Sequence, residues 1–294
     1  MIAIIGAGKW GQALAHAVGK NNSIVISSRS TKDIPHFVSM DEALKAPYLI
    51  ITIPAQFIRS WLVNNPLQKN QKVLVAAKGI EIENQAFLNE IYASYVDEQN
   101  IAFISGPSFA KEVIANLPTA MVINSKNRAL ASEFASFFPD NIKTYISDDV
   151  IGAEVAGAYK NVIAIASGVC DGLGLGNNAR AALISRGLVE MSRFGTVFGA
   201  KSDTFLGLSG AGDLFLTASS NLSRNYRVGY YLAQGQSLEN ILEQLGEVAE
   251  GVYTTKAIYK IATNQDIYTP IAHEVYQILE GKSPKQSLKD LLKA

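Results

Sequence analysis

The chain has 294 residues, of which 48% are hydrophobic, and its 26 lysine and arginine side chains balance 26 acidic ones. This length and apolar content fit two domains, each with its own core. Zero net charge gives no electrostatic reason to expect nucleic acid or an anionic membrane as a partner. No apolar run approaches the roughly 20 residues that span a bilayer.

The single cysteine, Cys170, excludes a disulfide within the chain, and this fits a reducing compartment. The first apolar run starts next to Met1 and leaves no room for a signal peptide. We therefore expect a cytoplasmic protein without stable membrane insertion.

The first 18 residues combine a strand, a glycine-rich turn and a helix. The apolar run Ile2–Ile5 leads into Gly6, Gly8 and Gly11, spaced G-x-G-x-x-G, and an alanine-rich helical pattern follows. In this context Gly6 permits a tight turn, Gly8 lets a pyrophosphate approach the backbone, and Gly11 lets the helix pack closely on its strand. The helix N-terminus adds partial positive charge. The stretch predicts a dinucleotide site rather than an unliganded turn.

The predicted second strand, residues 23–28, ends at Arg29, and no carboxylate follows until Asp33. An NAD site usually has an acidic residue there to hold the ribose 2′-hydroxyl. Arginine and serine instead suit a 2′-phosphate, so the segment favours NADP over NAD. A solvated loop arginine is the alternative.

Apolar runs alternate with helical patterns in the rest of the first half. Strands are predicted at 48–54, 72–77, 101–104, 120–123 and 143–146, and helices at 57–63, 85–95 and 129–137. This alternation predicts an α/β domain, a Rossmann-type doubly wound parallel sheet, over residues 1–147. Gly6, Pro54, Lys78 and Gly106 follow strands and should line the ligand edge of the sheet. Of these only Lys78 carries charge; a surface lysine is the alternative.

A capped helix start, Ser147-Asp148-Asp149, opens a long helix with many glycines and alanines, so that a neighbour can pack very close. Lys160 lies inside this apolar helix, and no residue three or four positions away can pair with its charge. It must point into a cleft, find a distant partner or lose its proton. Burial lowers a lysine pKa and suits it to proton transfer. The alternative is that the side chain extends along the helix to solvent.

The remaining sequence is helical, with almost no strand signal, which predicts an all-helical second domain over residues 148–294. Asp213 lies among glycines and is either a buried acid or a helix cap. Ser223-Arg224-Asn225 combines an arginine with two neutral hydrogen-bonding side chains, which can hold a phosphate or simply start a helix.

Eight motifs carry a family resemblance: GAGKWG, AAKGIE, SGPSFAKE, GAYKNVIAI, NNARAALISRG, GLSGAGDL, SRNYRVG and VAEGVYTTK. In this order, over nearly the whole chain, they resemble the bacterial NAD(P)-dependent glycerol-3-phosphate dehydrogenases. The blocks around Lys160, Asp213 and Arg224 are far more specific than the glycine fingerprint. The resemblance implies an oxidoreductase that interconverts dihydroxyacetone phosphate and sn-glycerol 3-phosphate with NADP or NAD, supplying glycerophospholipid synthesis.

The resemblance also implies roles for single residues. Lys160 is the general acid and base, Lys78 contacts substrate and cofactor, and Asp213 is an acid of the substrate site. The other implied substrate contacts are Gly106, Ser108, Ser223, Arg224 and Asn225. The implied cofactor contacts are Gly6, Gly8, Lys9, Trp10, Gly11, Arg29, Lys78, Ala110, Arg224, Val248 and Glu250.

These roles give a coherent reaction. Hydride passes from the nicotinamide to the substrate carbonyl carbon, and protonated Lys160 supplies the proton to the oxygen. Asp213 keeps Lys160 charged or orients it, while Lys78 and Arg224 neutralise the phosphate. No metal is expected, since the lysine polarises the carbonyl, and the three histidines form no ligand set.

Two features depart from the family pattern. Lys9 stands where relatives usually have a serine, and the segment 30–40 is shorter than usual.

Two other functions remain open: a two-domain dehydrogenase of the β-hydroxyacid type, and a non-catalytic nucleotide-sensing protein. The Ser223-Arg224-Asn225 cluster argues against the first and the two lysines against the second. We expect a homodimer.

Overall fold

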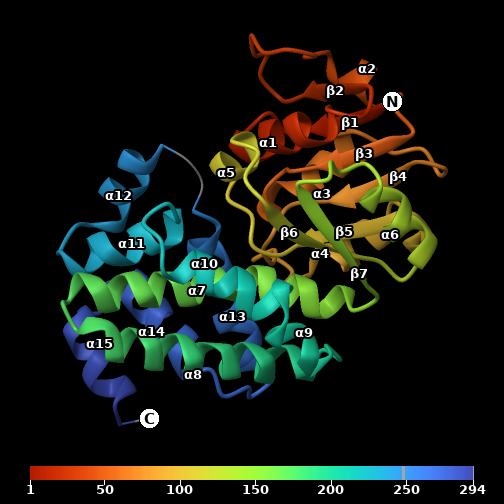
Figure 1. Cartoon of the computed structure of the whole chain (residues 1–294). Helices are drawn as coiled ribbons and strands as arrows, with labels where there is room; N and C mark the ends of the chain where they lie inside the picture. Colours follow the sequence, from red (N-terminus) through yellow and green to blue (C-terminus); the bar gives the residue numbers. More distant parts are fainter. Residues whose placement is uncertain (247–248, 294) are drawn as a thin grey trace. The chain divides into compact units, whose positions relative to one another are not determined.

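The computed structural model describes residues 1–246 and 249–293, and the chain divides into two compact units (Figure 1). The first unit comprises Met1–Ala77 and Leu88–Ala153, and the second comprises Lys78–Phe87 and Glu154–Ala294. The short segment Lys78–Phe87 therefore belongs to a different unit from the strand that precedes it in the chain. No helix among the described residues is long and apolar enough to cross a membrane.

A seven-stranded sheet forms the centre of the first unit, in the order β2-β1-β3-β4-β5-β6-β7. Its strands are β1 (Ile2–Ile5), β2 (Ile24–Ser27), β3 (Tyr48–Ile51), β4 (Lys72–Val75), β5 (Ile101–Ser105), β6 (Thr119–Asn124) and β7 (Ile142–Ser147). From β1 the chain winds outward to β2, and from β3 it winds the opposite way through β4 to β5. Right-handed crossovers then place helices on opposite faces, as in a doubly wound sheet. The predicted Rossmann-type fold is confirmed.

One pairing differs from the predicted all-parallel sheet: β6 runs antiparallel to β5, with Phe103 opposite Asn124. The connection from β5 contains only the five-residue helix α5 (Ala110–Ile114), after which Asn116 adopts a left-handed conformation with φ of 60°. The chain thus turns back before it can complete a crossover to the other end of the sheet. The partner strand β7 is parallel to β6.

The other helices of the first unit are α1 (Lys9–Val18), α2 (Met40–Ala43), α3 (Ala55–Asn64), α4 (Leu88–Ala93) and α6 (Arg128–Ala135). One face of the sheet packs against apolar residues of α1 and α6, including Leu14, Val18, Leu130 and Phe134. The predicted helix over 85–95 is wrong in its first turn. The chain becomes helical only at Leu88, and the preceding residues 78–87 are a non-helical segment of the second unit.

Apart from the non-helical segment Lys78–Phe87 and the connecting loops, the described part of the second unit is helical. It contains most of α7 (Val150–Gly172), then α8 (Gly176–Val197), α9 (Ser202–Leu206), a π-helical turn (Leu208–Gly212), α10 (Asp213–Ala218), α11 (Arg224–Ala233), α12 (Leu238–Leu245), α13 (Glu250–Asn264), α14 (Pro270–Leu279) and α15 (Pro284–Leu291). The first turn of α7 is capped by Asp149, which accepts a hydrogen bond from the Gly152 N–H, and not by Ser147 as predicted. The predicted helical character of this half is confirmed.

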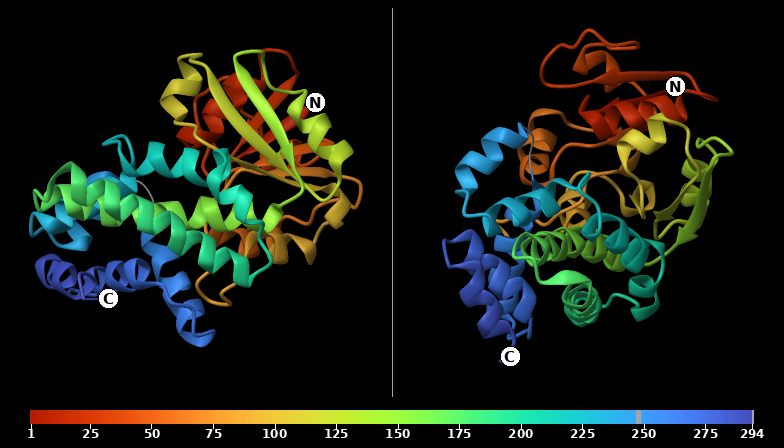
Figure 2. Two further views of the ribbon diagram at one scale, coloured as in Figure 1. Left: turned by 60° about the horizontal axis from the view of Figure 1, so that its bottom comes forward. Right: turned by 60° about the vertical axis from the view of Figure 1, so that its left-hand side comes forward.

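Glycines let two helices approach α7 very closely, as predicted from its composition. A Cβ atom on Gly168 of α7 would lie 1.9 Å from the Tyr226 carbonyl oxygen of α11, and one on Gly229 of α11 would lie 1.9 Å from the Ile165 oxygen. On another side, Gly187 of α8 meets Ile163, so α7 and α8 lie side by side (Figure 2). Backbone packs directly on backbone between α7 and α11, and α7 is buried along most of its length.

A buried carboxylate, Glu190 of α8, joins three helices. Glu190 accepts hydrogen bonds from the Tyr159 hydroxyl of α7 and from the N–H groups of Ile271 and Ala272, each at 2.8 Å. Those two N–H groups belong to the first turn of α14, where no intrahelical acceptor exists. Burial raises the pKa of Glu190, although all three donors oppose the rise. The side chain therefore acts as a cap supplied from another helix.

Replacing Glu190 by alanine should leave two buried N–H groups and one buried hydroxyl without an acceptor. We expect the free energy of unfolding to fall by about 3 kcal/mol, since each orphaned buried group costs roughly 1–3 kcal/mol. Urea unfolding followed by circular dichroism measures this change. The exposed Glu243→Ala variant is the control and should stay within about 0.5 kcal/mol of the wild type. Equal stability of the two variants would contradict this role of Glu190.

Candidate functional site

The glycine turn between β1 and α1 has the geometry that its sequence predicts. Gly6 has a φ of 109°, and a Cβ there would lie 2.3 Å from the Thr52 hydroxyl oxygen. A Cβ on Gly11 would lie 1.8 Å from the Gly6 carbonyl oxygen, so only glycine lets α1 pack on the turn. Gly8 differs from both, because nothing lies within 4 Å of its Cβ position. Packing within the protein therefore does not require glycine at position 8.

Helix α1 begins directly after this glycine turn. Gly8 is the N-cap residue and makes no side-chain capping bond, and the first turn contains no acidic residue. Uncapped N–H groups beside an open glycine form a cradle for an anion such as a pyrophosphate. The dinucleotide expected from the sequence therefore fits the residues present.

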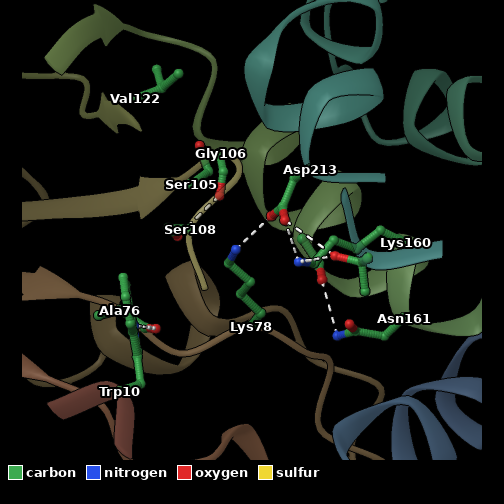
Figure 3. A network of polar contacts seen from close by, with 12 residues as sticks. Trp10, Ala76, Lys78, Ser105, Gly106, Ser108, Val122, Lys160, Asn161 and Asp213 are labelled. Atoms are coloured by element: carbon green, nitrogen blue, oxygen red, sulfur yellow. Dashed lines mark hydrogen bonds and ion pairs between the residues drawn. The ribbon is translucent and has the colours of Figure 1, made fainter. Parts of the chain in front are cut away.

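Other predicted cofactor residues lie on the elements around this turn. Trp10 of α1 donates a hydrogen bond from Nε1 to the Ala76 carbonyl oxygen, 3.1 Å away, at the end of β4 (Figure 3). Arg29 follows β2 and is exposed, Lys9 is the first residue of α1, and Ala110 is the first of α5, which packs against α1.

Gly106 follows β5 with a φ of 104°, and Ser108 donates a hydrogen bond to its carbonyl oxygen at 3.2 Å. Pro54 follows β3 and immediately precedes α3. These positions belong to the first unit, whereas Lys78 belongs to the second.

Two lysines and one aspartate form an ion-pair cluster inside the second unit (Figure 3). Lys160 Nζ lies 2.5 Å from Asp213 Oδ1, and Lys78 Nζ lies 2.5 Å from Asp213 Oδ2. The side chains of Lys160 and Asp213 are only 8% and 2% exposed, and that of Lys78 is 18% exposed. The lysine of α7 therefore does not extend to solvent; it shares a distant carboxylate with a second cation.

Glycines position the members of this cluster. Asp213 begins α10 directly after the π-helical turn, in which a Cβ on Gly210 would lie 2.2 Å from the Phe205 carbonyl oxygen. Such π-turns are uncommon and often occur at functional sites. On α7, a Cβ on Gly157 would lie 3.2 Å from Cγ of Lys78, so the missing side chain makes room for the stem of that lysine.

The sequence reasoning missed Thr217. Its hydroxyl accepts a hydrogen bond from Lys160 Nζ at 3.0 Å and lies 3.3 Å from Asp213 Oδ1, to which it donates. Thr217 is 5% exposed and stands four residues after Asp213 on α10. That spacing places both side chains on one helix face and was the signal available in the sequence.

The pKa is lowered for both buried members of the cluster, but for different reasons. Burial lowers the pKa of Lys160 to about 8, and the Lys78 ammonium adds to the effect, while Asp213 opposes it. For Asp213, burial disfavours the charged form, but the two ammonium groups outweigh it and lower the pKa below its usual value. Near neutral pH the site thus combines a fixed carboxylate with a lysine that can release its proton.

Ser223, Arg224 and Asn225 begin α11. Ser223 caps the helix by accepting a hydrogen bond from the Tyr226 N–H at 3.3 Å, and Arg224 is its first helical residue. Asn225 is buried and accepts a hydrogen bond from the Gly251 N–H of α13. Glu250 is the first residue of α13. The predicted contact Val248 lies outside the described residues.

The role of the open space beside Gly8 in nucleotide binding can be tested by placing a methyl group there. Because Gly8 has a φ of −74° and no neighbour at its Cβ position, Gly8→Ala should change the stability by less than about 0.5 kcal/mol. The methyl group should nevertheless raise the Kd for NADPH or NADH by about tenfold or more, equivalent to at least about 1.4 kcal/mol. Quenching of tryptophan fluorescence measures this affinity.

Gly11→Ala is the matched comparison, since its methyl group collides with the Gly6 carbonyl oxygen. It should weaken nucleotide binding and lower the unfolding midpoint as well. Unchanged affinity in Gly8→Ala would contradict a pyrophosphate contact at this position.

Comparison with known proteins identifies the family. Residues 149–289 match the model of the NAD-dependent glycerol-3-phosphate dehydrogenase C-terminus, and residues 29–131 match that of its N-terminus. The chain is 61% identical to a glycerol-3-phosphate dehydrogenase [NAD(P)+] of Sulfurimonas denitrificans, covering 99% of this chain and 98% of that one. It is 60% identical to the enzyme of that name from Nitratiruptor, covering 99% and 97%.

A solved structure supports the same assignment. The crystal structure of a glycerol-3-phosphate dehydrogenase from Coxiella burnetii superposes with a TM-score of 0.93 at 33% identity, covering 100% of this chain and 98% of that chain. Sequence and fold therefore agree along the whole chain. The protein belongs to the NAD-dependent glycerol-3-phosphate dehydrogenase family.

Proposed function

We propose that this enzyme reduces dihydroxyacetone phosphate to sn-glycerol 3-phosphate with NADPH or NADH, and catalyses the reverse oxidation. The observation that carries the proposal is the buried cluster in which Asp213 pairs with both Lys160 and Lys78. Relatives at about 60% identity are named for this activity and for either cofactor. Sn-glycerol 3-phosphate made in this way would supply glycerophospholipid synthesis.

The proposed cofactor site uses the N-terminal residues 1–147, with contributions from the other part of the chain. Its members are Gly6, Gly8, Lys9, Trp10, Gly11, Arg29, Lys78, Ala110, Arg224, Val248 and Glu250. The proposed substrate site uses residues 148–294 together with residues from the first part. Its members are Lys78, Gly106, Ser108, Lys160, Asp213, Ser223, Arg224 and Asn225. We also propose a cytoplasmic homodimer.

When a nicotinamide cofactor is bound, it would supply the hydride for the carbonyl carbon. The chain itself manages charge and protons. Protonated Lys160 donates a proton to the carbonyl oxygen as it becomes a hydroxyl, and Asp213 and Thr217 hold the ammonium in place through the contacts described above. In the oxidation, neutral Lys160 accepts that proton. Lys78 and Arg224 balance the charge of the substrate phosphate.

The low pKa of Lys160 predicts opposite pH dependences for the two directions. Reduction needs the protonated lysine, so its kcat/KM should fall as the pH rises above about 8. Oxidation needs the neutral lysine, so its kcat/KM should rise up to the same region. Steady-state rates across pH 6 to 10 would show this crossover, and identical profiles for the two directions would contradict the assignment.

Lys160→Ala distinguishes an enzyme from a nucleotide-sensing protein. Loss of the general acid should lower kcat by about 10²–10⁴-fold while nucleotide still binds. A partly exposed lysine, Lys256, which pairs with Glu280, provides the control, and Lys256→Ala should keep wild-type turnover. Wild-type turnover in Lys160→Ala would refute its catalytic role.

The activity and the cofactor preference are tested together by the loss of nicotinamide absorbance with dihydroxyacetone phosphate, using NADPH and NADH in parallel. Rapid oxidation of either cofactor supports the proposed reaction. Absence of oxidation with both, while nucleotide binds, would overturn it and favour the β-hydroxyacid alternative or a sensor.

If Arg29 contacts a 2′-phosphate, Arg29→Asp should lower kcat/KM for NADPH relative to NADH by about tenfold or more, the loss of one charge-assisted contact. Lys32→Ala removes a nearby exposed charge and serves as the control. An unchanged ratio in Arg29→Asp would exclude this contact.

A further inference from the structure

Asn225 is held in one orientation by the backbone of another helix. Its side-chain oxygen Oδ1 accepts a hydrogen bond from the Gly251 N–H at 3.0 Å, and the residue is 8% exposed. An N–H group can donate to the oxygen of an amide but not to its NH2 group. The bond therefore decides which end of the Asn225 amide faces α13 and which end faces away from it.

The outward end is the Nδ2 amino group. Among the described residues, Nδ2 donates a hydrogen bond to none, so both of its hydrogens remain available to a ligand. Arg224 precedes Asn225 in the chain, and Ser223 caps the same helix. The end of α11 thus combines a guanidinium group with an amide whose acceptor oxygen is turned inward, an arrangement of donors that suits an anion.

Only glycine permits this contact at position 251. A Cβ atom there would lie 2.7 Å from Asn225 Oδ1 and 2.9 Å from the Asn161 carbonyl oxygen. The Asn161 oxygen belongs to the backbone of the buried helix α7 and has little freedom to move. The other side of Gly251 is fixed by Thr255, whose hydroxyl donates to the Gly251 carbonyl oxygen at 2.6 Å.

We propose that Gly251 is a positioning residue for substrate recognition: its N–H group turns the Asn225 amide so that Nδ2 donates to a phosphoryl oxygen of the substrate. This inference rests on the proposed function and assigns part of its specificity to α13. Without the bond from Gly251, the amide could rotate and present Oδ1, an acceptor, to the phosphate. Gly251 acts only through Asn225 and touches no reacting atom.

The test compares a substrate that has the phosphate with one that lacks it. Gly251→Ala should lower kcat/KM for dihydroxyacetone phosphate by about tenfold or more, the usual cost of a lost hydrogen bond to a charged group. For dihydroxyacetone, the loss should be less than about threefold, because Lys160 and Asp213 are unaffected. Asn225→Asp keeps an oxygen toward Gly251 but removes the NH2 donor, so it should show the same selective loss.

Thr255→Val is the matched control in the same turn of α13. It removes the hydrogen bond to the Gly251 carbonyl oxygen but leaves the N–H group and Asn225 in place. It should keep the wild-type ratio of the two kcat/KM values even if its thermal midpoint falls. An equal loss on both substrates in Gly251→Ala and Asn225→Asp, or no loss, would overturn the inference.

Calorimetric titration with inorganic phosphate gives an answer independent of turnover. Weaker phosphate binding by Gly251→Ala and Asn225→Asp than by the wild type and Thr255→Val supports the inference, and equal binding by all four overturns it. Failure of the wild type to reduce dihydroxyacetone phosphate would overturn the proposed function. That outcome can be told apart from either result of the phosphate titration.

Discussion

The cluster in the second unit depends on one carboxylate that serves two cations. Asp213 pairs with Lys160 through one oxygen and with Lys78 through the other. When both lysines are protonated, the cluster carries one net positive charge in a largely buried place. Such a charge is costly in the free protein but favours an anionic ligand, so the imbalance itself selects for negatively charged substrates. Burial, with a smaller contribution from the Lys78 ammonium, lowers the pKa of Lys160 and makes it easier to deprotonate than an ordinary lysine, while Asp213 opposes this effect.

Backbone geometry holds this cluster in place. The close approach of α11 to α7 is possible only because Gly168 and Gly229 lack side chains, and Gly157 leaves space for the stem of Lys78. The π-helical turn before α10 brings Asp213 to the two ammonium groups. Gly168 and Gly229 meet rigid main chain, so a side chain there should force α7 and α11 apart, whereas a side chain at Gly157 should displace the charged Lys78 side chain itself.

The sequence was most informative where the decisive contacts are local. The β1 turn could be predicted because strand, glycines and helix adjoin, and Lys160 could be recognised as unusual from its own helix. Its partner could not be deduced from spacing, since Asp213 is 53 residues away and only the fold brings them together. The antiparallel direction of β6 was missed because it depends on how a short connection turns. The hydrogen bond from Gly251 to Asn225 likewise joins helices far apart in the chain.

The segment Lys78–Phe87 has a consequence for chain connectivity. It follows β4 of the sheet, yet it packs with the helical unit, where Gln85 bonds to Asn264 and Phe87 contacts Phe198. Neither unit is therefore one uninterrupted stretch of polypeptide. A ribosome that has released only the first 153 residues has made every strand, but the ten-residue segment still lacks its partners. Expressing the helical half alone would likewise omit one of its cations, so neither half is a self-sufficient module.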